Sequence, residues 1–89
     1  MASIRNIKKD IDYLISEVIS DCCTFMALYP DKKQEEALAL ISETLDLRNT
    51  LIARVNHPEG KAKAHYRAIF NDLLKGVDAS FQKISAFTK

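Results

Sequence analysis

The chain has 89 residues, of which 47% are hydrophobic and 28% charged, and its formal net charge is +1. This composition excludes a disordered chain, which combines low hydrophobicity with high net charge. The near-neutral charge argues against a general role in binding polyanions, but it does not describe local patches. Because domains of fewer than about 50 residues are rare, we expect one helical-bundle domain over residues 1–89.

Neither a secretory signal nor a membrane-spanning helix is predicted. The N-terminal isoleucines are separated by charged residues, and no apolar run reaches the roughly 18 residues of a membrane helix. The two cysteines, Cys22 and Cys23, are adjacent within a helical pattern, where a disulfide between neighbours would be strained. We therefore expect a cytoplasmic protein with two free thiols and no membrane partner.

The first predicted helix covers residues 4–28. Pro30 ends it, because the residue before a proline is pushed out of the α region. Ser3 is the expected N-cap of this helix and Asp31 that of the next. The apolar side chains recur at spacings of three and four, which predicts an amphipathic helix: Ile4, Ile7, Ile11, Leu14, Val18, Cys22 and Phe25.

The second predicted helix covers residues 32–55 and organises the rest of the chain, because its apolar arc fills about half of its circumference. One neighbouring layer would cover an arc of only about 100°. The arc divides into two ridges, one formed by Leu38, Ile41, Leu45 and Ile52, and the other by Leu40, Leu47 and Leu51.

The ridge of Leu40, Leu47 and Leu51 exceeds what a simple three-helix bundle requires. We expect a second copy of the chain to bury it. Arg48 projects from the same arc and is expected at that interface or paired with Asp10, Asp12 or Asp72, since an unpaired buried guanidinium would be very costly.

The third predicted helix covers residues 60–87. Gly76 lies in its middle, where glycine costs about 1 kcal/mol relative to alanine, and this predicts a close helix crossing. One face carries the apolar side chains expected in the core: Ala62, Tyr66, Ile69, Phe70, Leu73, Leu74, Val77, Phe81, Ile84 and Phe87.

Three helices of similar length joined by short turns predict an all-α fold, an up-down-up antiparallel bundle. With the surplus ridge covered by a second copy, we expect a homodimer and a six-helix assembly.

The expected topology gathers charge at one end of the bundle. The start of the first helix, the end of the second and the start of the third hold eight basic and five acidic residues, a net of +3, and the other half has a net of −2. Cations at helix N-termini oppose the helix dipole, so this end is a candidate anion-binding site. The candidate residues are Lys8, Lys9, Lys61, Lys63 and Arg67.

Function is predicted less sharply than fold. No phosphate-binding loop, metal-ligand spacing or nucleophile motif is present, so no cofactor or metal is expected. We expect a non-catalytic module that acts through protein–protein contact. One alternative is binding of an acidic protein, anion or nucleic-acid backbone at the basic end. The other is a small enzyme using Arg48, His65 and a nearby aspartate.

Overall fold

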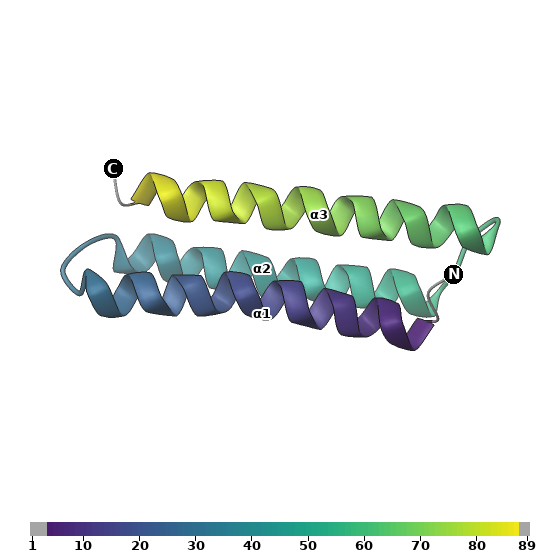
Figure 1. The fold of residues 1–89 in the computed structure, drawn as a ribbon, viewed down its shortest axis with the longest axis horizontal. Helices are drawn as coiled ribbons and strands as arrows, with labels where there is room; N and C mark the ends of the chain where they lie inside the picture. The colour runs from purple at the N-terminus through teal and green to yellow at the C-terminus, as the bar shows by residue number, and fades with distance from the viewer. Residues whose placement is uncertain (1–3, 88–89) are drawn as a thin grey trace.

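The computed structural model describes residues 4–87, with side chains from Asn6 onward, and over this range it contains helices and no strand. The helices are α1 (Ile4–Leu28), α2 (Gln34–Asn56) and α3 (Ala62–Phe87). Figure 1 shows α1 and α2 as an antiparallel hairpin, with α3 returning alongside. The expected all-α, three-helix architecture is confirmed, and the molecule measures 48 × 18 × 18 Å. The expected cap Ser3 lies outside the described residues.

The first turn differs from the prediction, because α2 begins at Gln34 and not at residue 32. The residue before the helix is Lys33, in the left-handed conformation with φ of 51°, and no side chain caps the helix. The Gln34 side-chain amide turns back instead and donates to the carbonyl oxygens of Tyr29 at 2.8 Å and Lys32 at 3.1 Å. Asp31 is therefore not the N-cap of α2. The Gln34 side chain instead satisfies two carbonyl groups of the turn itself.

The second turn joins the other end of α2 to α3. The His57 amide donates to the Arg54 carbonyl at 3.3 Å and closes the last turn of α2. Gly60 adopts a φ of 67°, a left-handed conformation that glycine tolerates at no steric cost. As a result α3 begins at Ala62, two residues later than predicted.

The core is a continuous seam of apolar side chains from all three helices, and two polar residues are buried within it. The Thr44 hydroxyl donates to the Leu40 carbonyl at 2.7 Å, and the Ser80 hydroxyl donates to the Gly76 carbonyl at 2.9 Å. These bonds to the preceding turn satisfy both hydroxyls. The buried apolar cluster comprises Ile7, Ile11, Ile15, Val18, Cys22, Leu40, Leu51, Val55, Ile69, Leu73 and Val77.

Helix α3 packs tightly against Leu47 of α2 at Gly76, as the position of this glycine in the sequence predicts. A Cβ atom added there would overlap a terminal methyl group of Leu47. Glycine therefore allows the two helices to approach each other with Leu47 between them.

Candidate functional site

The ridge of α2 that was expected at an interface lies in the core, and two leucines of the other ridge are exposed. Leu40 is 3% exposed and Leu51 1% exposed, and Leu47 packs over Gly76. Leu38 and Leu45, expected in the core, are 54% and 42% exposed. The side of α2 that faces both α1 and α3 is centred on Leu40 and Leu51, so the interface expected there is not at the surface of the folded chain.

Surplus apolar surface is also present on α3, where the sequence placed all apolar residues in the core. Phe70 is 40% exposed and Leu74 45% exposed. The two residues are four positions apart, so their side chains are neighbours on one side of the helix. We call this pair the α3 patch. Phe81 continues the same side two turns later and is partly buried against the core.

Arg48 forms a surface ion pair with one of the acids expected from the sequence. Its Nε donates to Asp12 Oδ1 at 2.7 Å, and its Nη1 donates to the side-chain oxygen of Asn49 at 3.2 Å. Both charged side chains are more than one-third exposed, and exposed pairs contribute about 0–1 kcal/mol. The pair holds α1 against α2 and leaves no buried charge.

His65 does not meet Arg48; it lies at the junction of α2 and α3. Its Nε2 is 2.6 Å from the Arg54 carbonyl oxygen, and its Nδ1 is 3.5 Å from the Glu59 amide nitrogen. The amide can only donate, so Nδ1 accepts, and Nε2 carries the proton and donates to the carbonyl. Both ring nitrogens are therefore occupied by backbone groups, and His65 caps the C-terminal end of α2.

Arg54 is the residue beside His65 that the sequence analysis missed. Its Nη1 donates to Asp72 Oδ2 at 2.7 Å, across the α2–α3 contact. A depression of about 480 Å³ adjoins this pair and is lined by Thr50, Ala53, Arg54, His57, Glu59 and His65. The His65 imidazole and the Asp72 carboxylate beside this depression are both engaged by neighbouring groups of α2 and of the second turn.

The five candidate anion-binding residues lie toward the end where α1 begins and α3 begins (Figure 1). Four are exposed and Lys8 is half-buried. Among the described side chains the ion pairs are Arg48–Asp12, Arg54–Asp72 and Lys83–Glu43, and none uses a candidate residue. Two acids of this end, Asp12 and Asp72, are instead paired with Arg48 and Arg54 of α2. The five residues are Lys8, Lys9, Lys61, Lys63 and Arg67.

The cysteines differ in accessibility. Cys22 is buried in the core and Cys23 is exposed, and both are free thiols. Burial raises the pKa of the Cys22 thiol, and the neighbouring Cys23 and Asp21 raise it further. The reactive thiolate of Cys22 is therefore scarce at neutral pH as well as shielded.

We expect a disulfide reagent added to the native protein at neutral pH to modify one thiol rapidly, and the second only on unfolding. A spectrophotometric count of released thiolate measures this. Cys23→Ser should remove the fast phase. Two thiols reacting at one rate in the native protein would contradict the burial of Cys22.

Comparison of the chain with family models, with curated proteins and with solved structures finds no match. The described residues hold no cluster of three or more side chains able to bind a metal ion. None of the described helices is long and apolar enough to cross a membrane.

Proposed function

We propose that this protein is a non-catalytic helical module that acts through protein–protein contact, with two copies joined at the α3 patch into a six-helix homodimer. The proposal rests on one observation: Phe70 and Leu74 are large, substantially exposed and adjacent. Single exposed apolar residues are normal on protein surfaces, but adjacent ones in a continuous patch are typical of a contact site.

The α3 patch is favoured over the exposed residues of α2. Leu38 and Leu45 are seven residues apart, or about 10 Å along the helix axis, so each stands by itself. Phe70 and Leu74 form one surface, and Phe81 extends it toward the other end of α3. A module of this kind fits the reducing cytoplasm, where both cysteines remain thiols.

The test is the mass of the protein in solution. Light scattering at micromolar concentration should give about twice the 10.1 kDa chain mass. Phe70→Ser combined with Leu74→Ser should weaken dimerisation by about two orders of magnitude. Each substitution is present in both copies, so four apolar side chains are lost from the interface. The matched control, Leu38→Ser with Leu45→Ser, removes similarly exposed side chains from α2 and should remain dimeric. A monomeric wild-type protein would contradict the proposal.

A further inference from the structure

The outer side of α3 carries a stripe of residues ordered by charge. Lys63 and Arg67 precede the α3 patch and Asp78 follows it, and the whole series advances in steps of three and four residues, which keeps it on one side of the helix. All three charged residues are exposed, and none takes part in an ion pair of the described structure. The stripe is therefore basic at one end, apolar in the middle and acidic at the other.

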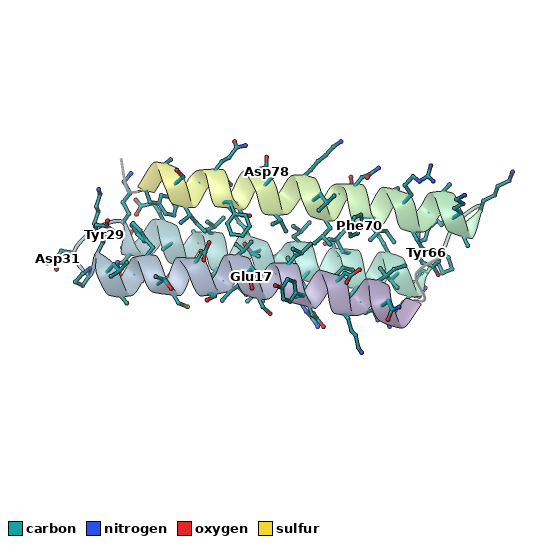
Figure 2. All side chains as sticks on the ribbon, in the orientation of Figure 1. Glu17, Tyr29, Asp31, Tyr66, Phe70 and Asp78 are labelled. Carbon is teal, nitrogen blue, oxygen red and sulfur yellow. The ribbon has the colours of Figure 1, made fainter. Side chains whose placement is uncertain are left out.

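Helix α1 adds two more acids to the acidic end. The rings of Phe25 on α1 and Phe87 on α3 are in contact, with centroids 5.5 Å apart. This contact sets the level of the two parallel helices, and counting back from it puts Glu17 and Asp21 at the levels of residues 79 and 83 of α3, just after Asp78. Asp21 lies four residues and Glu17 eight residues before Phe25, on the same edge of α1. Figure 2 labels Glu17 on α1 together with Phe70 and Asp78 on α3.

We infer that the second copy docks antiparallel on this stripe, with the basic end of each chain against the acidic end of the other. The inference rests on the proposed dimer and adds its orientation and charge pairing. When Phe70 faces Leu74 of the second copy, the spacing places Arg67 within one residue of Asp78 of the second copy and within about two residues of the level of Glu17. Lys63 then reaches the level of Asp21 of the second copy.

The surface is self-complementary in this orientation only. A two-fold axis through the α3 patch repeats every contact twice, as an isologous interface requires. A parallel pair would bring Arg67 against Arg67 and Asp78 against Asp78, and juxtaposed like charges disfavour a complex. The antiparallel arrangement also gives the cations at the start of α3, which the helix dipole disfavours within one chain, an acidic partner.

Charge reversal tests the inference. Lys63→Glu with Arg67→Glu, and separately Glu17→Lys with Asp78→Lys, should each weaken the dimer by at least about tenfold, because like charges then meet at both ends. An equimolar mixture of the two variants should dimerise like wild type, and so should a single chain carrying all four substitutions. Lys8→Glu with Lys9→Glu, at the same end of the molecule but on α1, is the matched control and should leave the dimer intact. Sedimentation equilibrium measures all five samples.

The outcomes separate the two proposals. If wild type is monomeric, both fail. If the charge variants dimerise like wild type while Phe70→Ser with Leu74→Ser is monomeric, the proposed function stands and the antiparallel inference is overturned. A second result would also overturn the antiparallel inference. In it, Lys63→Glu with Arg67→Glu still dimerises but no longer binds inorganic polyphosphate, which wild type binds. The basic end would then bind a polyanion. A misfolded variant could not be rescued by mixing, so recovery in the mixture is the supporting result.

Discussion

Leu51→Ala should lower the free energy of unfolding by about 2–5 kcal/mol, the range measured when a fully buried leucine is truncated. Leu51 is completely enclosed by the other two helices and belongs to the central apolar cluster. A chain of this length has a total stability of roughly 4–13 kcal/mol, so the substitution removes a large share of it. Urea denaturation followed by circular dichroism, at fixed protein concentration, measures the loss.

Leu45→Ala is the control for this prediction, because it removes the same atoms from the neighbouring ridge of the same helix. Leu45 is 42% exposed, and truncation there should cost no more than about 1 kcal/mol. Equal losses at both positions would show that α2 is rotated from the orientation described. A larger loss at Leu45 would mean that its ridge is the buried side of α2, as first expected from the sequence.

Gly76→Leu should destabilise the protein by about 1–3 kcal/mol, the cost of forcing extra atoms into a packed contact. Helix propensity alone predicts the opposite sign, because leucine favours a helix by nearly 1 kcal/mol over glycine. The contact with Leu47 decides the sign, since even a single Cβ atom at Gly76 would overlap that side chain. Ala68→Leu, at an exposed site on the same helix, should change stability by less than about 0.5 kcal/mol.

A double-mutant cycle assigns this cost to the named contact. In a Leu47→Ala background the space beside residue 76 is open, so Gly76→Leu should lose much less stability or gain some. The coupling energy should fall within about 0.5–3 kcal/mol, the range for residues in direct contact. A coupling near zero would mean that the two helices do not cross at Gly76.

The apolar residues that remain at the surface were predicted only in part. The wide apolar arc of α2 correctly indicated more apolar surface than one three-helix chain needs, but periodicity assigns a residue to a helix side and not to a neighbour. Leu40 and Leu45 both belong to that arc; only the positions of α1 and α3 decide that the first is buried and the second exposed. Phe70 was placed in the core for the same reason, because the α3 arc is also wider than its neighbours cover.

For the charged residues too, the sequence predicted one part and only the structure supplied the rest. Charge counts along the chain indicated a basic end, and the helix order was enough to locate it. The partner of each charged residue could be assigned only from distances in the structure. Asp12 was one of three acids expected within reach of Arg48. No sequence pattern linked Arg54 with Asp72, or His65 with the Arg54 carbonyl. Those contacts depend on the rotation and level of α3 against α2.

The sequence by itself determined that this protein is three amphipathic helices broken near Pro30 and Gly60, because helix periodicity and turn chemistry act over a few neighbouring residues. It also determined that glycine at position 76 marks a close crossing. The tertiary structure alone decided which ridge of α2 is enclosed, which arginine meets which aspartate, and that Phe70 and Leu74 remain at the surface. The physical reason is that burial and ion pairing depend on the rotation of each helix about its axis, which is set by the packing of all three together.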